Sequence, residues 1–524
     1  MYLLFYCFVG FSLQDVEIPK LRDLIVVQEN YALKDILSSV VALENPFLAA
    51  DQVVPEKFVY DDEVTSISHL NRANRDLLFQ GDMVLTRDHL ARIVRESLAP
   101  RRKRTAFRDK NYPDTIWKPY VPYIFHSSLS PLAVKSIKAA MNFWQKNTCV
   151  KFQKAGSEKT TLVFSSLESG CWSTVGKDSK LKRQVLNIGE GCEHFGITSH
   201  ELAHALGLFH EQSRYDRDDH VSINIDKLPK DSYNDFAKIG IMMMTPYRQP
   251  YDIGSIMHYR PNEFSIDGSA TILAKDVSLQ NSMGQFFGPS FSDVAKINSH
   301  YQCGSLCKKK IQCQNSGFQD SKNCETCVCP SGFGGIFCET IQKSNPARCS
   351  GYLNATSTQR RLKVNMKPKS TELKSLRSCY YHIEAPEGQK IEVYVDSVIG
   401  RCVQGCYAEG VELKTKKDVR PTGARLCCKI KKPQRYVSEG SRIVVLAHSS
   451  DKQTFVQIRY NIFDPNAQFD GSQEDVNSED VTNDNKIDLA DASSSLTNPD
   501  SEQTLDKTFR DILLDENLKN NEIE

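Results

Sequence analysis

The sequence predicts a multidomain protein with an α+β domain, a small disulfide-rich module and an all-β domain, in that order. The chain has 524 residues, which is enough for about three or four domains. Helical periodicity and strand-like alternation of apolar residues both occur between residues 105 and 303, whereas alternation alone prevails between residues 349 and 463. Six closely spaced cysteines at residues 307–338 separate these regions and predict a module that disulfides stabilise.

Residues 1–13, MYLLFYCFVGFSL, are apolar but shorter than the about 20 residues that a helix needs to cross a bilayer. We interpret them as a signal peptide, and the alternative is a buried N-terminal strand. Of the 17 cysteines, Cys7 lies in this segment and the others fall between Cys149 and Cys428. Such clustering is typical of a disulfide framework made in an oxidising compartment, so we expect a secreted, extracellular protein without a membrane span.

Residues 14–104 contain no cysteine and are expected to form weak helices at residues 31–43 and 86–98. The basic run RRKR, residues 101–104, ends this region. Such a run can be a nuclear signal or a solvated surface. In a disulfide-rich secretory chain we interpret it as a site for a proprotein convertase, which would cut after Arg104 and release residues 14–104 as a propeptide.

The next region, residues 105–303, is expected to be a sheet that carries helices. It begins with a predicted strand in which Val121, Tyr123 and Phe125 alternate with other positions. Ser130 and Pro131 are residue types preferred at the N-cap and first position of a helix, and apolar residues follow at helical spacing. Further strands are predicted at residues 150–152 and 161–164, and a short amphipathic helix at residues 291–301.

The stretch SHELAHALGLFHEQSR, residues 199–214, contains a candidate metal site. His200 and His204 are four residues apart, so on a helix they lie on one face and can bind one cation. Glu201 is placed to act as a base on a metal-bound water rather than as a ligand. Gly207 lets the chain leave the helix through a left-handed conformation, which allows His210 to return as a third ligand.

Three neutral histidines suit Zn²⁺ and leave its fourth tetrahedral position open for water, which is the catalytic arrangement rather than the structural one. The pattern HExxH also occurs in helices that bind no metal. The longer pattern HExxHxxGxxH fixes five positions, each with a mechanical reason, and disfavours that alternative. We therefore predict one zinc ion per catalytic domain.

Glu211 and Arg214 extend the pattern to HExxHxxGxxHExxR, which resembles the astacin family of metzincin metallopeptidases. The resemblance implies an α+β metzincin fold with a zinc cleft over residues 105–303. It implies that Met257, in the sequence SIMHY, forms an apolar floor beneath the metal. It also implies that Tyr259 is a further zinc ligand that swings away to stabilise the transition-state oxyanion.

The resemblance also covers latency and activation. The sequence FQGD, residues 79–82, resembles the family's FxGD motif, in which the aspartate binds the zinc and displaces the catalytic water. Asp82 would therefore be a ligand in the latent form only, although a Gly-Asp pair by itself is usually a turn. In family members the N-terminus freed by activation is buried against the glutamate after the third histidine, which is Glu211 here.

Two disulfides are expected in the catalytic domain. The family pairing joins Cys149 with Cys303. Cys171 and Cys192 bracket a loop and are expected to pair, and in the family this stretch forms the sheet edge that binds an extended substrate. Trp172 would then contact the substrate, or else pack in the core.

Resemblances to known modules also cover the rest of the disulfide framework. Residues 304–339 resemble an epidermal-growth-factor-like (EGF-like) module, whose usual pairing would be Cys307–Cys324, Cys313–Cys327 and Cys329–Cys338. Residues 349–463 resemble a CUB domain, a β-sandwich, with Cys349 and Cys379 as a pair. The pairing among Cys402, Cys406, Cys427 and Cys428 stays open. The sequence NAT at residues 354–356 makes Asn354 a candidate glycosylation site.

Charge is segregated along the chain, although the formal net charge is only +1. Residues 464–524 contain 17 acidic and 4 basic residues and are expected to form a disordered acidic tail. Residues 349–463 contain 21 basic and 10 acidic residues. This surplus suits acidic matrix glycans as partners, or is simply a solvated basic surface. No nucleic-acid partner is expected.

These observations predict a secreted zinc endopeptidase, made as a zymogen, that hydrolyses peptide bonds of extracellular proteins. The alternative is a catalytically inert adhesion or matrix-binding protein. An inert descendant is expected to lose Glu201 or one of the three histidines, and all four residues are present. The sequence therefore favours the enzyme.

Overall fold

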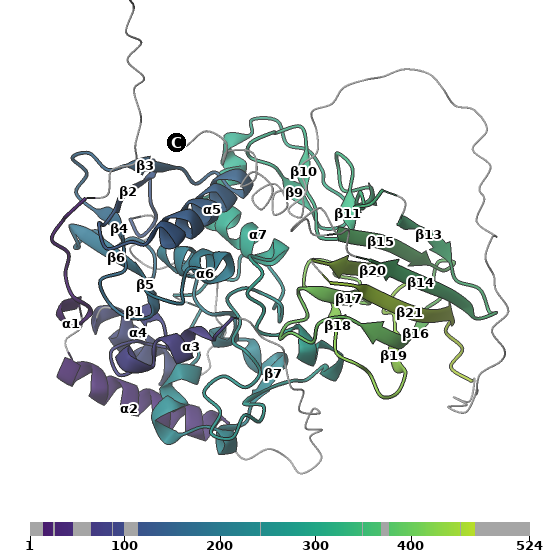
Figure 1. Cartoon of the computed structure of the whole chain (residues 1–524), viewed down its shortest axis with the longest axis horizontal. Coiled ribbons are helices and arrows are strands. Elements are labelled where there is room, and N and C mark those ends of the chain that lie inside the picture. Colours follow the sequence, from purple (N-terminus) through teal and green to yellow (C-terminus); the bar gives the residue numbers. More distant parts are fainter. Residues whose placement is uncertain are drawn as a thin grey trace, which may run out of the picture.

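The computed structural model describes residues 14–24, 27–45, 64–85, 87–98, 114–241, 243–347, 349–367, 377–450 and 452–466. The expected signal peptide, the expected cleavage site at Arg104 and nearly all of the acidic tail lie outside these ranges. Figure 1 shows a mixed helix and sheet region on the left and a β-sandwich on the right, with small hairpins above the junction. None of the described helices is both long enough and apolar enough to cross a membrane.

The mixed region is built on a six-stranded sheet with the order β1-β5-β6-β4-β2-β3. Its strands are β1 (Met83–Val84), β2 (Val121–Phe125), β3 (Phe152–Lys154), β4 (Thr161–Ser165), β5 (Cys171–Thr174) and β6 (Arg183–Ile188). Only the pairing of β5 with β6 is antiparallel in this sheet. The strand expected at residues 150–152 begins only at Phe152, because the N–H of Val150 is bonded to the Thr148 side chain.

Helix α5 (Pro131–Asn147) confirms the predicted helix start. The Ser130 hydroxyl accepts a hydrogen bond from the Ala133 N–H at 3.0 Å, and Pro131 is the first helical residue. Ile137 and Trp144 are buried on the face that packs in the core with α6 (Phe195–Ala205). Helix α7 (Phe291–His300) completes this core, and Figure 1 shows the three helices at the centre of the molecule.

The N-terminal region wraps around this domain. Its elements are α1 (Leu21–Leu24), α2 (Val27–Glu44), α3 (Ile67–Leu70), η1 (Arg72–Asn74), β1 and α4 (Arg87–Ser97). The helices expected at residues 31–43 and 86–98 therefore form, with bounds shifted by a few residues. Strand β1 pairs with β5 and so covers the edge of the sheet.

The chain between α6 and α7 is poor in regular structure. It contains η2 (Glu211–Ser213), η3 (Arg217–Asp219), β7 (Val221–Ile223), η4 (Ile225–Lys227), η5 (Lys230–Phe236), β8 (Ile272–Ala274) and η6 (Val277–Ser282). β7 and β8 form a two-stranded antiparallel sheet, and helix α2 packs on η5. A second hydrophobic core joins this region to N-terminal residues such as Leu37, Met83 and Leu90.

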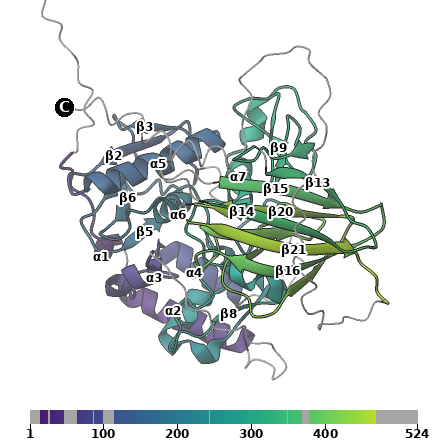
Figure 2. The same ribbon diagram turned by 45° about the vertical axis from the view of Figure 1, so that its right-hand side comes forward.

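The C-terminal part consists of two hairpins and a sandwich, all β as expected. After η7 (Cys303–Leu306) the hairpins pair β9 (Phe318–Gln319) with β10 (Cys327–Val328), and β11 (Phe333–Gly334) with β12 (Thr340–Ile341). One sandwich sheet contains β13 (Ser350–Asn354), β15 (Arg377–Glu384), β20 (Arg442–Ser449), β17 (Glu409–Lys414) and β18 (Ala424–Leu426). The other contains β14 (Arg360–Met366), β21 (Thr454–Ile462), β16 (Ile391–Ile399) and β19 (Gln434–Val437), and Figure 2 shows it facing the viewer.

Eight disulfides join the described cysteines. Six are the pairs that the resemblances imply: Cys149–Cys303, Cys171–Cys192, Cys307–Cys324, Cys313–Cys327, Cys329–Cys338 and Cys349–Cys379. The pairing that the sequence left open is Cys402–Cys428 and Cys406–Cys427.

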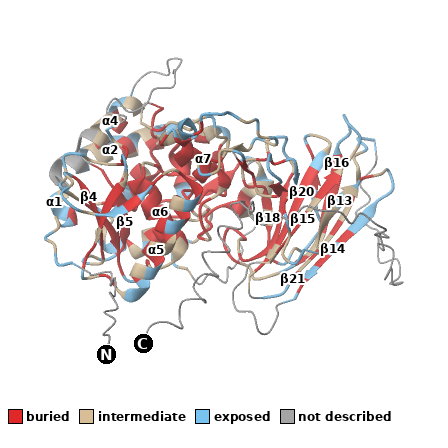
Figure 3. Cartoon of the chain, turned by 90° about the horizontal axis from the view of Figure 1, so that it is seen from above, coloured by how far each residue is buried: buried red, intermediate tan, exposed pale blue. Residues whose placement is uncertain are grey.

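The sandwich packs directly against the helical domain, and Figure 3 shows buried segments on both sides of the junction. The Ser282 hydroxyl donates to the Gly423 carbonyl at 2.8 Å and accepts from the Arg425 N–H at 3.1 Å. The rings of Phe287 and Tyr407 stack with centroids 5.9 Å apart. The loop between β17 and β18 thus reaches the region that follows the metal-site residues in the chain.

Candidate active site

Helix α6 positions the first two histidines. The His194 side chain caps its N-terminus by accepting a hydrogen bond from the Gly196 N–H at 3.2 Å. Residues 196–205 are all buried, so α6 runs through the core with His200 and His204 one turn apart. Their ring centroids are 4.6 Å apart. The helix therefore supplies two metal-ligating groups at a fixed separation.

Gly207 allows the third histidine to join them. Its φ is +110°, which side chains rarely adopt, and a Cβ at this position would lie only 2.7 Å from His300 Nε2. Both the backbone conformation and the close packing therefore require glycine. The chain turns back after this residue, and the His210 ring lies 4.8 Å from that of His204.

Hydrogen bonds to carbonyl groups fix the orientation of the imidazoles. His200 Nδ1 donates to the Ile256 carbonyl at 2.8 Å, and His204 Nδ1 donates to the Leu208 carbonyl at 2.7 Å. His210 Nδ1 donates to Gln80 Oε1 at 3.3 Å. With the proton on Nδ1, each Nε2 keeps a free lone pair directed at the centre of the triad.

The donor atoms have the spacing of a tetrahedral zinc site. His200 Nε2 lies 3.0 Å from His204 Nε2 and 3.3 Å from His210 Nε2. Asp82 Oδ2 lies 3.1 Å from Nε2 of both His200 and His210. Ligands at about 2.0–2.2 Å from a tetrahedral ion are about 3.3–3.6 Å apart. Lone pairs of neutral imidazoles repel each other at this distance unless a cation lies between them, so the four groups fit Zn²⁺.

Burial controls the charge of these ligands. It lowers the pKa of His210 to about 4, against the opposing charge of Asp82, and so keeps the imidazole neutral for metal binding. Burial also opposes ionisation of Asp82, but the nearby histidines outweigh it and hold the pKa of this carboxyl well below its usual range. Asp82 is therefore a carboxylate next to the neutral imidazole of His210.

Glu201 lies beside the triad but outside the group of donor atoms. Its side chain is fully buried, and neither carboxylate oxygen has a hydrogen-bond partner among the described residues. Burial raises the pKa of Glu201 well above its ordinary value, and the charge of Asp82 raises it further. An unpaired buried carboxyl next to a metal site is suited to exchange protons.

Tyr259 contacts the N-terminal region in this structure. Its hydroxyl donates to the Gln80 carbonyl, and its ring centroid lies 4.8 Å from that of His210. Met257 is buried in the core, and its carbonyl accepts a hydrogen bond from the Glu211 N–H at 2.8 Å. The Met257 segment is thus tied directly to the residue that follows the third histidine.

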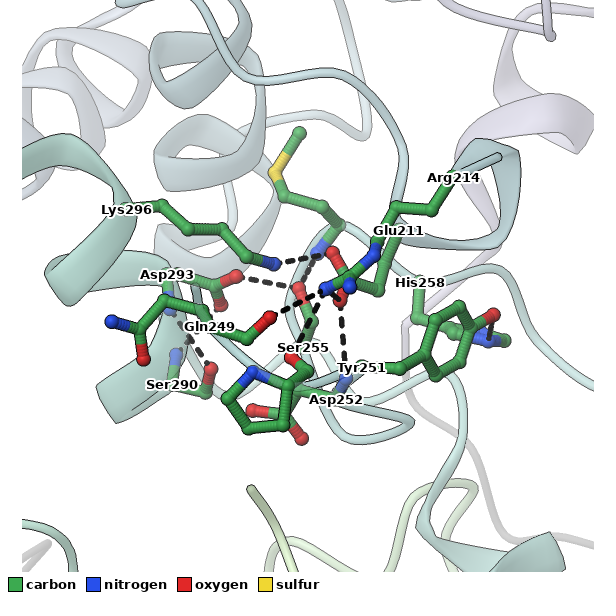
Figure 4. A network of polar contacts seen from close by, with 12 residues as sticks. Glu211, Arg214, Gln249, Tyr251, Asp252, Ser255, His258, Ser290, Asp293 and Lys296 are labelled. Atoms are coloured by element: carbon green, nitrogen blue, oxygen red, sulfur yellow. Dashed lines mark hydrogen bonds and ion pairs between the residues drawn. The ribbon is translucent and has the colours of Figure 1, made fainter. Parts of the chain in front are cut away.

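A buried network of polar contacts surrounds Glu211 (Figure 4). Its Oε2 accepts from Lys296 Nζ, and its Oε1 accepts from Arg214 Nη1 and from the Asp252 N–H, both at 3.0 Å. Burial opposes ionisation of Glu211, but Lys296 and Arg214 overcome it and lower its pKa to about 2. The negative charge of Glu211, next to His210, is therefore compensated by Lys296 and Arg214.

The sandwich contributes to this network. The Thr422 N–H, in the loop between β17 and β18, donates to Asp252 Oδ1 at 2.9 Å, and the Gly254 N–H donates to the same oxygen at 3.1 Å. A continuous series of hydrogen bonds therefore connects Thr422 through Asp252 to Glu211.

Sequence reasoning missed Lys296, Asp252 and Gln80. No local pattern indicates that Lys296 is buried, because Lys296 and Asp293 lie on the side of the helix opposite the apolar residues Phe291, Val294 and Ile297. No local pattern indicates Asp252 or Gln80, because both act through contacts with distant segments.

Three convergent imidazoles with a buried glutamate beside them define a zinc-dependent peptidase. Residues 109–302 match the family model of the astacin peptidases. The chain belongs to the astacin family of zinc metalloproteinases, which confirms the predicted family, the enzyme class and the zinc cofactor. Its substrates are proteins.

The relatives cover most of the chain. It is 55% identical over 451 residues to zinc metalloproteinase nas-23 of Caenorhabditis elegans, with 86% of this chain and 84% of the relative covered. Identity to nas-29 of the same organism is 42% over 476 residues, covering 87% and 89%. Among solved structures, high choriolytic enzyme 1, a hatching enzyme zinc-protease of the medaka fish Oryzias latipes, is 34% identical, covers 38% of this chain and 94% of its own, and has a TM-score of 0.33.

Proposed function

We propose that this protein is a secreted zinc endopeptidase, made as a zymogen, that cleaves extracellular proteins with Glu201 as the general base. One observation carries the proposal. Asp82 lies within hydrogen-bonding distance of two zinc-binding histidines, while the buried Glu201 beside them has no hydrogen-bond partner among the described residues. This arrangement fits an intact catalytic site that the chain's own N-terminal region blocks. It disfavours an inert adhesion or matrix-binding protein.

The proposed organisation follows the sequence. It comprises a signal peptide (1–13), a propeptide (14–104), a peptidase domain (105–303), an EGF-like module (304–339), a CUB domain (349–463) and an acidic tail (464–524). The eight disulfides suit an oxidising compartment, and Asn354 is exposed at the end of β13, as a glycosylation site requires. The basic surplus of residues 349–463 suits acidic matrix glycans as partners.

The proposed mechanism uses Glu201 and Tyr259 around the metal. Bound zinc supplies a Lewis acid that makes water nucleophilic near neutral pH. Glu201 accepts the proton of the attacking water and then donates it to the leaving amine, because its carboxyl group has no other hydrogen-bond partner among the described residues. The Tyr259 hydroxyl, once released from Gln80, donates a hydrogen bond to the developing oxyanion.

The proposed propeptide blocks the cleft at three points. Asp82 takes the place of the catalytic water among the imidazoles. The Asp82 carbonyl also accepts from the Ser173 N–H at 3.0 Å, so β1 occupies the β5 edge that an extended substrate would need. Trp172 on β5 is buried against residues of this region such as Leu78 and Val84, which supports contact with a bound peptide segment in the cleft.

Activation would cut after Arg104 by a proprotein convertase. The released N-terminus would then approach Glu211, whose carboxylate already pairs with Lys296 and Arg214. The new terminal ammonium would therefore join an existing buried network rather than create one. Met257 and Gly207 would support the site through the backbone contacts described above.

The proposal is tested by expressing the full chain with its signal peptide and collecting the medium. The secreted protein is assayed on a quenched peptide library before and after cleavage by a convertase, each with and without a zinc chelator. We expect chelator-sensitive cleavage only after processing. Intracellular retention, or a processed protein without chelator-sensitive activity, would contradict the proposal.

Asp82→Ala is expected to make the unprocessed chain active. The substitution removes the group that occupies the fourth position among the imidazoles, so water can enter there. We expect the rate of the uncut chain to rise by at least about 10-fold, which corresponds to about 1.4 kcal/mol. The measurement is the initial rate of peptide cleavage by the uncut zymogen. Asp23→Ala, at an exposed position of α1, is the matched control and should stay as latent as the wild type.

Tyr259→Phe in the processed enzyme is expected to lower kcat by about 10²- to 10³-fold with little change in KM, because a single oxyanion donor is lost. Steady-state kinetics on one peptide checks this. Since the ring packs against His210 and Phe264, phenylalanine preserves the packing and isolates the hydroxyl. A change confined to KM would assign Tyr259 to substrate binding instead.

A further inference from the structure

We infer that the mature cleft contains a subsite for a basic side chain of the substrate, formed by Asp231, Ser232 and Phe264. In the zymogen Arg75 of the propeptide occupies this subsite. The inference rests on the proposed function, because it requires residues 14–104 to leave on activation. It extends that function by naming the class of substrate, proteins with arginine or lysine near the scissile bond.

Three groups of the peptidase domain hold the Arg75 guanidinium. Its Nη2 donates to Asp231 Oδ1 at 3.0 Å and to the Ser232 hydroxyl. Its Cζ lies 5.5 Å from the centroid of the Phe264 ring. A carboxylate, a hydroxyl and an aromatic face are complementary to the planar, charged guanidinium. The site is open at the surface, because the side chains of Arg75 and Asp231 are 31% and 73% exposed. We call the three groups the cation pocket.

The pocket adjoins the catalytic site through one ring. The Phe264 centroid lies 5.7 Å from that of Tyr259 and 6.0 Å from that of Phe236. A Cβ built at Gly81, next to Asp82, would lie 3.2 Å from Phe264 Cζ. The backbone next to the metal-binding aspartate and the Arg75 side chain therefore lie near the same aromatic ring. In the zymogen, the segment that places Arg75 at this site therefore also places Asp82 beside the zinc-binding histidines.

The charge of η5 favours a cation once the propeptide is gone. Asp231 and the buried Asp235 lie on this helix, whose only basic residue is the exposed Lys230. Helix α2, which packs on η5, carries Lys34, and its Nζ donates to the carbonyls of Asp76 and Leu78 of the propeptide.

Burial raises the pKa of Asp235 to about 7, and the charges of Lys34 and Arg75 oppose this rise. Both compensating cations belong to the propeptide. Its departure removes these two cations, together with the carboxylates of Asp76 and Asp82, and leaves two aspartates and one lysine on η5. A substrate with a basic side chain at this site is therefore favoured over a substrate with an acidic side chain there.

The inference is tested on the full chain, processed in the 101–104 run and loaded with zinc. Quenched peptides share one scaffold and carry arginine, its neutral analogue citrulline, or glutamate at each position around the scissile bond in turn. Exposed ion pairs and cation–π contacts each change affinity by only a few-fold. We therefore expect kcat/KM to favour arginine over glutamate by about 5- to 20-fold at one position.

Two substitutions of Asp231 test whether the preference for arginine arises from the cation pocket. Asp231→Asn should bring the ratio of kcat/KM for arginine over citrulline close to one, and Asp231→Arg should make glutamate the preferred residue. Asp226→Asn removes the same charge from an exposed position on η4 and should leave the ratio unchanged.

Equal cleavage of the arginine, citrulline and glutamate peptides at every position would overturn the inference and leave the proposed function intact. A preference for arginine that survives both Asp231 substitutions would also overturn it, because the pocket would lie elsewhere. A processed enzyme that cleaves no peptide at all would overturn the proposed function together with the inference.

Discussion

Glu201→Ala is expected to lower the kcat of the processed enzyme by about 10²- to 10⁴-fold while the zinc content stays that of the wild type. The metal-binding group consists of three histidines and, in the zymogen, Asp82. Glu201 lies outside it, so its loss removes a proton acceptor and no ligand. The alanine substitution also removes a buried carboxyl group that has no hydrogen-bond partner among the described residues. The free energy of unfolding should therefore not fall.

The measurement combines steady-state kinetics with metal analysis of the same purified sample. Glu201→Gln retains the side-chain volume and should show the same loss of kcat, which separates proton transfer from packing. Glu190→Ala, at an exposed position before α6, is the matched control and should keep full activity. His204→Ala should lose zinc and activity together. Loss of zinc from Glu201→Ala, or retention of more than about a tenth of the activity, would refute the role of general base.

The zinc triad was predictable because its geometry is local. An interval of four residues on a helix sets the relation between His200 and His204, and a single glycine explains the return of His210. The first helix of the peptidase domain was predictable for the same reason, since Ser130 and Pro131 determine where it starts. Features that depend only on neighbouring residues can be predicted without knowing the fold.

The surroundings of the triad were not predictable because they depend on tertiary contacts. Lys296 lies 85 residues from Glu211, and Thr422 lies 170 residues from Asp252. Strand β1 has two residues, too few for any alternation, and exists because β5 offers it a free edge. The sandwich was predictable as an all-β domain from alternation, but its contacts with the peptidase domain were not.

Lys296→Met is expected to lower the free energy of unfolding by about 3–5 kcal/mol, because it leaves part of the buried charge of Glu211 uncompensated. The side chains of Lys296 and Glu211 are 5% and 1% exposed, so water cannot replace the lost partner. Arg214 remains in contact with Glu211, which places the effect toward the lower end of this range. Lys182→Met, at an exposed position, is the matched control and should change stability little.

The effect should depend on pH in a defined direction. The pKa of Glu211 is about 2 in the folded protein and near its ordinary value of 4.5 when unfolded, so its ionised form stabilises the fold above pH 4.5. That contribution is lost as the pH falls from 4.5 toward 2. The difference between wild type and Lys296→Met should therefore be largest near neutral pH and shrink on acidification, as denaturant unfolding at a series of pH values would measure. A difference that is independent of pH would mean that Lys296 acts through packing, and that Arg214 is enough to compensate the charge of Glu211.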